Sequence, residues 1–282
     1  MKTARLAILD MYEGLPNQGM RCIKEILSQF GDVVEWEIFD VRSLAEVPDL
    51  SFDIYISTGG PGNPTDGDGV WDVKYFKWLD AVWQWNLNPE NSRKHVFLIC
   101  HSFQMACLHF GLAEVSRRKS VSFGTFICHI TEEGHDEPLF DGLDNPFYVA
   151  DFRDFQVTQP DEARFEDMGA KIIALEKLRP HIALERALMA VRFSEEIFGV
   201  QFHPEADSEG MLKHFLDPER RQKIVKEHSE EKYLQMIEHL NDPGKIGLTH
   251  DIILPLFLRR ALSTVVGKPA VSSGQLAGVF GF

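Results

Sequence analysis

The feature of this sequence that most restricts its fold is a regular alternation of short apolar runs with helical patterns between residues 6 and 110. The apolar runs are too short for helices, whereas the segments between them repeat apolar residues every three or four positions. Predicted strands cover 6–9, 33–41, 54–57 and 95–100, and predicted helices cover 19–30, 70–85 and 102–110. This order predicts an α/β fold with a mostly parallel central sheet and helices on both faces.

The middle of the chain has a different pattern. Its predicted strands cover 123–131, 146–157, 171–175, 188–193 and 197–202, and they are joined by acidic turns marked by Gly or Pro. Short strands connected in this way are typical of antiparallel pairing. We therefore expect antiparallel strands that extend the same sheet.

The sequence changes again after Glu205. Helical patterns cover 217–241 and 249–266, the second interrupted by Pro255, and residues 267–282 are rich in Gly and Ser. Residues 249–266 are too apolar to remain in water. We therefore predict a main domain at 1–205 and a helical extension at 206–282, which packs on the main domain or on a second subunit of a homodimer.

Charge and composition exclude several classes of partner. The formal net charge of −14 repels phosphate backbones and anionic bilayers, so we expect neither nucleic acid nor membrane as a partner. The four cysteines form no CxxC pair and the chain shows no secretory context, which favours a cytoplasmic location. The histidines lack metal-ligand spacing and no phosphate-binding glycine motif is present, so we expect no metal and no cofactor.

One cysteine stands where a nucleophile is expected. The apolar run 95–99 leads directly into Cys100 and then into a helical pattern that begins at Ser102. A cysteine on such a strand-to-helix turn is exposed above the sheet edge, and the helix N-terminus favours its thiolate form. Cys100 is therefore the candidate nucleophile.

Two further motifs can complete a catalytic site. Residues 57–64 read Ser-Thr-Gly-Gly-Pro-Gly-Asn-Pro, in which Gly59 and Gly60 allow backbone N–H groups to approach an oxyanion. Residues 199–205 read Gly-Val-Gln-Phe-His-Pro-Glu, and the extended conformation before Pro204 places His203 and Glu205 on one side. His203 can then act as the base for Cys100 while Glu205 orients its imidazole.

These three motifs, in this order and over about residues 50–205, resemble the class I (triad-type) glutamine amidotransferase family, including the amidotransferase half of GMP synthase. The resemblance implies a flavodoxin-like α/β fold and hydrolysis of the glutamine side-chain amide through a cysteine thioester. Ammonia would then pass to an acceptor or synthetase enzyme on another chain. The implied catalytic residues are Cys100, His203 and Glu205. The implied oxyanion and substrate-binding residues are Gly59, Gly60, His101, Gln104 and Arg153.

The chain departs from the family pattern at several positions. Leu98 and Ser102 replace two glycines around the nucleophile, and Phe103 replaces a histidine. Asp151 and Phe152 lie where the family has a serine and a histidine that help to bind the glutamine backbone. Two alternatives therefore stay open: a hydrolase of another γ-glutamyl amide, and a catalytically impaired binding or regulatory protein.

Overall fold

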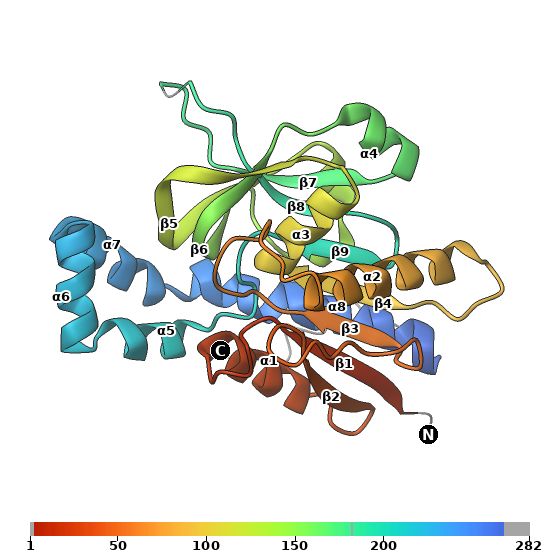
Figure 1. Ribbon diagram of the computed structural model, residues 1–282. Coiled ribbons are helices and arrows are strands. Elements are labelled where there is room, and N and C mark those ends of the chain that lie inside the picture. Colours follow the sequence, from red (N-terminus) through yellow and green to blue (C-terminus); the bar gives the residue numbers. More distant parts are fainter. Residues whose placement is uncertain (1–2, 182, 268–282) are drawn as a thin grey trace.

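The computed structural model of the protein describes residues 3–181 and 183–267 (Figure 1). Within these residues the strands form one nine-stranded sheet in the order β2-β1-β3-β4-β9-β8-β7-β5-β6. The strands are β1 (Ala4–Asp10), β2 (Val34–Asp40), β3 (Ile54–Ser57), β4 (His95–Ile99), β5 (Glu114–Ile130), β6 (Phe147–Thr158), β7 (Lys171–Glu176), β8 (Leu188–Arg192) and β9 (Ile197–Val200).

The sheet has a parallel half and an antiparallel half. β2, β1, β3, β4 and β9 pair in parallel. From β9 to β6 every pairing is antiparallel. The predicted α/β fold is therefore confirmed, as is the addition of antiparallel strands to the same sheet.

Helices cover both faces of the parallel half. The helices are α1 (Gln18–Ser28), α2 (Trp71–Leu87), α3 (His101–His109), α4 (Glu162–Met168), the cap helices α5–α7 described below, and α8 (Leu248–Val266), with short 3-10 turns at η1 (Glu133–Asp136) and η2 (Pro138–Phe140). α1 and α8 share one hydrophobic cluster with the sheet, and α2 and α3 share the cluster on the opposite face. The carboxyl ends of the parallel strands remain open between these layers, which is where open α/β sheets bind ligands.

α8 belongs to the core. Its apolar residues from Ile252 to Leu262 are buried against the strands, and Phe257 contacts Phe97 with ring centroids 5.0 Å apart. The helix continues through Pro255 although a proline in a helix interior costs about 3 kcal/mol. Burial of several large apolar side chains, at about 1.5–3 kcal/mol each, outweighs that cost.

A group of short helices, which we name the cap, covers the outer end of β5 and β6. The cap consists of α5 (Ser208–Phe215), α6 (Pro218–Glu227), α7 (Glu230–Leu240) and the π-helical turn η3 (Pro243–Gly247), and it extends from the sheet in Figure 1. The single helix expected at 217–241 is two helices, because the side chain of Ser229 accepts a hydrogen bond from Lys232 N and starts α7. Met211, Phe215 and Met236 pack the cap onto Ala150 of β6.

None of the helices in the described ranges combines the length and the apolar character that crossing a bilayer requires. The Gly/Ser-rich segment falls, from residue 268 onward, outside the described residues.

Candidate active site

Cys100 occupies a strained turn between β4 and α3. Its φ of 48° lies in the left-handed region, which side chains other than glycine rarely adopt. The turn is fixed on both sides, since Cys100 N donates to Val200 O at 2.7 Å and Cys100 O accepts from Gln104 N at 3.0 Å. Such a turn presents the side chain at the top of the sheet, which is the geometry of a nucleophile elbow.

The residues that replace the family's glycines fit around this turn. Leu98 is fully buried, and the absence of a Cβ on Gly199 in the neighbouring strand β9 leaves space for it: an added Cβ there would lie 3.3 Å from Leu98 Cβ. Ser102 Oγ is within hydrogen-bond distance of Ser57 Oγ, at 2.7 Å, and donates to Thr58 O at 2.6 Å. These departures are therefore accommodated without displacing Cys100.

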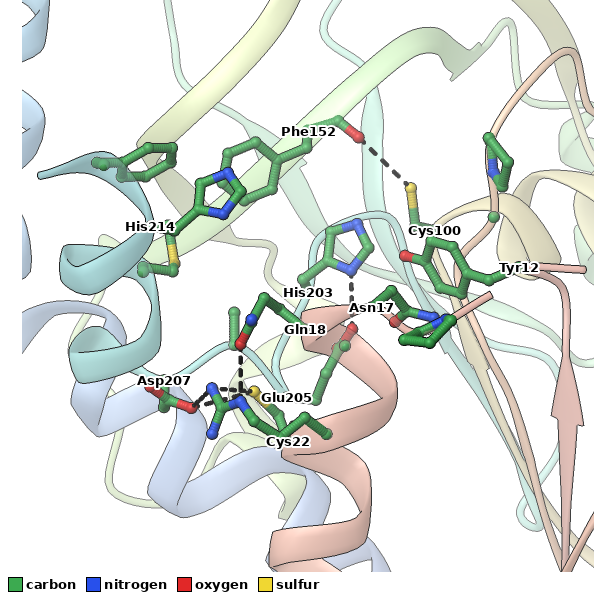
Figure 2. Close-up of a pocket in the computed structure, with 18 of the residues that line it drawn as sticks. Tyr12, Asn17, Gln18, Cys22, Cys100, Phe152, His203, Glu205, Asp207 and His214 are labelled. Carbon is green, nitrogen blue, oxygen red and sulfur yellow. Dashed lines mark hydrogen bonds and ion pairs between the residues drawn. The ribbon is translucent and has the colours of Figure 1, made fainter. Parts of the chain in front are cut away.

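His203 lies between Cys100 and Glu205 (Figure 2). His203 Nδ1 and Glu205 Oε1 are 2.8 Å apart; the Glu205 side chain is buried and the His203 side chain is 11% exposed. Burial alone would lower the pKa of His203, but the Glu205 carboxylate and the Cys100 sulfur raise it well above its ordinary value. The arrangement therefore favours a charged imidazolium beside the sulfur.

Two polar contacts and a nearby phenol complete the surroundings of the sulfur. Gln201 Nε2 donates to Cys100 Sγ at 3.6 Å, and the thiol donates to Phe152 O over a long 3.9 Å. Burial raises the pKa of Tyr12 to about 12. The charge of His203 opposes this rise and the charges of Glu205 and Cys100 add to it, so the phenol stays protonated.

Sequence reasoning missed Tyr12 and Gln201. A signal for Gln201 existed, because it is a polar residue within the motif that contains His203.

Two glycines let these groups approach one another. A Cβ added to Gly59 would lie 2.7 Å from His203 Cε1 and 3.0 Å from the Tyr12 hydroxyl. A Cβ added to Gly19, at the N-terminus of α1, would lie 3.1 Å from Glu205 Oε1. The positive end of α1 thus lies beside a buried carboxylate, which stabilises the negative charge.

Two cavities meet at Cys100, and both are bordered by Gly60, Pro61, Phe123 and Phe152. The large cavity, of about 570 Å³, has His203 and Glu205 in its wall and extends to the N-terminus of α1 and to the cap. The small cavity, of about 190 Å³, is lined by α3, the β5–β6 hairpin and the glycine-rich turn.

The remaining predicted site residues line the small cavity. Burial, with the nearby charge of Arg42, lowers the pKa of His101 to about 3, so its imidazole is neutral, and its Nε2 has no hydrogen-bond partner among the described residues. Gln104 Nε2 donates to Phe155 O and to Gln201 Oε1, at 3.1 and 3.0 Å. The amide of Gln104 therefore holds the wall of the cavity together.

Arg153 also borders the small cavity, but its guanidinium lies in a buried ion pair. Arg153 Nε donates to both carboxylate oxygens of Asp151 at 3.0 Å, and Arg153 Nη2 lies 3.6 Å from Glu176. Asp151 in turn accepts from Ser122 Oγ at 2.6 Å. Only Nη1 of the guanidinium lacks a partner among the described residues, and substrate binding by Arg153 stays a prediction.

No group of three or more His, Cys, Asp or Glu side chains that could hold a metal ion occurs within residues 3–181 and 183–267.

Comparison with solved structures finds other proteins of the same fold. A glutamine amidotransferase from Thermotoga maritima superimposes with a TM-score of 0.65 at 15% identity, covering 93% of this chain and 99% of that one. A glutamine amidotransferase from Methylobacillus flagellatus gives 0.55 at 15%, covering 96% and 97%. The glutaminase domain of Trypanosoma brucei CTPS gives 0.53 at 17%, covering 72% and 86%. No curated protein shows a significant match.

At these identities the solved structures establish the fold alone, whereas the family is established by the sequence. The sequence profile of the family described as glutamine amidotransferase class-I matches residues 7–220, which include the nucleophile turn, the glycine-rich turn and the His203–Glu205 pair. A match over most of the chain, joined to this site geometry, shows that the protein belongs to the class-I glutamine amidotransferase family.

Proposed function

We propose that this protein is a cysteine-dependent amidohydrolase that cleaves the side-chain amide of glutamine through a thioester on Cys100. The observation that carries the proposal is the partly buried contact between His203 Nδ1 and Glu205 Oε1, beside a sulfur held on a strained turn. Nucleophile, base and orienting acid are the three parts that thiol catalysis needs.

The chemistry follows from these positions. The Cys100 sulfur attacks the amide carbon of glutamine, and His203 delivers a proton to the departing nitrogen, so that the C–N bond breaks and ammonia leaves. Water then attacks the thioester, the C–S bond breaks, and the proton returns to His203 as glutamate forms. Glu205 keeps the imidazole oriented and stabilises its charge in both steps.

The glycine-rich turn and the start of α3 supply the oxyanion site. The hydrogen bonds found among the described residues include none from the backbone N–H of Gly59 or Gly60. His101 follows the nucleophile directly, in the first turn of α3, where N–H groups have no intrahelical partner. Donors that are free before the reaction can stabilise negative charge on the carbonyl oxygen without rearrangement.

The ammonia would pass to an acceptor or synthetase enzyme on another chain. Residues 206–267 form the cap and α8, which cover the sheet, and no phosphate-binding glycine motif occurs in the sequence. Within residues 3–181 and 183–267 there is no activating synthetase domain.

The test measures glutamate release from glutamine by the full chain and by two cysteine variants. Cys100→Ala should lose at least about 1,000-fold in kcat/KM, since it removes the nucleophile. Cys107→Ala, a buried thiol of the same helix, is the matched control and should retain activity in its folded fraction. Iodoacetamide should label Cys100 ahead of the other thiols. If wild-type protein releases no glutamate and Cys100 resists alkylation, the protein is the binding or regulatory member of the fold.

A further inference from the structure

The large cavity is far bigger than the proposed reaction requires. Ammonia is about the size of water, whose share of liquid volume is about 30 Å³, whereas this cavity measures about 570 Å³. That volume lies in the range of small-molecule binding pockets, roughly 300–1,000 Å³. The cavity therefore has room for a substantial organic group beside Cys100.

The position of His203 assigns a role to each cavity. A general acid must lie within hydrogen-bond reach of the nitrogen that it protonates, so the leaving amine departs on the imidazole side. His203 lines the large cavity and is absent from the walls of the small one. The acyl part of the substrate then occupies the small cavity, next to Gln104, and the amine part occupies the large cavity.

The walls of the large cavity indicate the chemistry of that amine. Phe123, Phe152 and Phe215 form an aromatic cluster on one side, with ring centroids 5.2 to 6.3 Å apart, and Met211 lies beside them. An apolar body of the amine would be removed from water against these rings.

Among the described residues, one guanidinium in the wall forms no ion pair with an acidic side chain. Arg220, in the first turn of α6, lines the cavity, and its one hydrogen bond from the side chain in the described ranges goes to His214 Nε2 at 2.6 Å. Burial and the charge of Arg220 lower the pKa of His214, so this imidazole stays neutral and accepts the bond. The other arginine of the wall, Arg21, is already paired with Glu25 and Asp207.

We infer that the large cavity binds the amine portion of a γ-glutamyl amide, and that this amine carries an apolar body against the three phenylalanines and a carboxylate at Arg220. A γ-glutamyl dipeptide with an apolar second residue has this chemistry. The inference rests on the proposed thioester chemistry and names its substrate class: the bond between the γ-carbonyl and the amine nitrogen breaks, His203 protonates that nitrogen, and water releases glutamate.

The experiment compares three substrates that share the γ-glutamyl group. γ-Glutamyl-phenylalanine has the ring and the carboxylate, γ-glutamyl-phenethylamide has the ring alone, and glutamine has neither. We expect kcat/KM for γ-glutamyl-phenylalanine to exceed that for glutamine by about 10- to 100-fold, because a phenyl group is buried. Arg220→Gln should lower kcat/KM for γ-glutamyl-phenylalanine about 5- to 20-fold. This loss lies in the lower range for a charged hydrogen bond because Arg220 is exposed. The kcat/KM values for the other two substrates should stay unchanged.

Arg221→Gln is the matched control, since this neighbouring arginine pairs with Glu230 and does not line the cavity. An equal loss for all three substrates in Arg220→Gln, or no preference of the wild type for the dipeptide, would overturn the inference.

Binding to Cys100→Ala separates this inference from the proposed function. Calorimetry on that variant should show tighter binding of γ-glutamyl-phenylalanine than of γ-glutamyl-phenethylamide, and Arg220→Gln should remove the difference. Equal binding overturns the inference even when glutamine is hydrolysed. Selective binding without hydrolysis by the wild type sustains the cavity assignment and overturns the thioester reaction.

Discussion

The two sides of Cys100 are built on different physical principles. The small cavity is bordered by the neutral imidazole of His101, by the hydrogen-bonded amide of Gln104 and by Arg153, which pairs with Asp151. The large cavity has a charged pair, His203 with Glu205, and an arginine on the cap without an acidic partner in the described ranges. In the proposed reaction, side chains that are paired within the protein suit the constant γ-glutamyl group, whereas an arginine on a surface helix suits a more variable amine. The difference suggests a division of roles in the proposed reaction: the small cavity holds the part of the substrate that stays constant, and the large cavity holds the part that varies.

The largest effect on the contrast between the two cavities is expected when the charge of Glu205, in the wall of the large cavity, is removed. Glu205→Gln leaves the imidazolium without its carboxylate partner, so kcat/KM for glutamine should fall about 100- to 10,000-fold. Steady-state glutamate release measures the loss. Glu209→Gln, on the exposed first turn of α5, is the control and should match the wild type. A loss smaller than about tenfold would contradict the orienting role of Glu205.

A smaller effect on kcat/KM is expected when the space that Gly59 leaves beside His203 is filled. Gly59→Ala places a Cβ 2.7 Å from His203 Cε1, so the imidazole must shift by several tenths of an ångström. We expect kcat/KM to fall about 10- to 100-fold, since misplacement of a catalytic group by 1 Å costs about 100-fold. Gly31→Ala, whose added Cβ meets only Ser28 O at 3.5 Å, serves as the comparison for melting temperature. Unchanged activity in a folded Gly59→Ala protein would show that His203 is not confined here.

The smallest effect concerns pH and distinguishes the two histidines. The lowered pKa of His101, about 3, means that the unfolded chain binds a proton that the folded chain refuses below about pH 6.5. Stability is therefore full above that pH and is lost as pH falls toward 3. His203 acts in the opposite direction: its raised pKa adds stability below pH 6.5, and this contribution is lost as pH rises through the folded value.

Urea unfolding at pH 6.5 and 4.5 measures the contribution of His101. His101→Gln should reduce the loss of unfolding free energy between these pH values by roughly 1–2 kcal/mol. His135→Gln, at an exposed position, should leave the difference as in the wild type. The same pH dependence in all three proteins would mean that His101 is not held neutral.

Local patterns were sufficient to predict the framework of the site. The strand at 54–57 was predicted with its observed ends, and the turn at Cys100 followed from an apolar run that meets a helical pattern. These features depend on neighbouring residues. The chemical roles of Cys100, His203 and Glu205 stay proposals until the activity measurements described above are made.

Features that depend on distant segments were not predictable. Tyr12 reaches the site because β1 lies beside β3, and nothing near it in the sequence marks this position. The sequence has a helical pattern at 217–241 but does not place the cap at the site, since Phe215 meets Phe123 and Phe152 from positions 92 and 63 residues away. In the sequence Gly199 is only part of a motif, and the space that it leaves for Leu98 becomes visible only when β4 pairs with β9.

The backbone at Cys100 has a consequence for how this protein can change over generations. A residue with a Cβ at a φ of 48° costs roughly 1 kcal/mol or more, and glycine would relieve that cost. A lineage that had no use for the thiol could gain stability by a single exchange to glycine, because mutation readily finds such stabilising changes. The sequence instead keeps a strained side chain at the mouth of two cavities. In the proposed function, the stability lost to strain at Cys100 is the cost of keeping its thiol, and an exchange to glycine there would mark a descendant that binds without reacting.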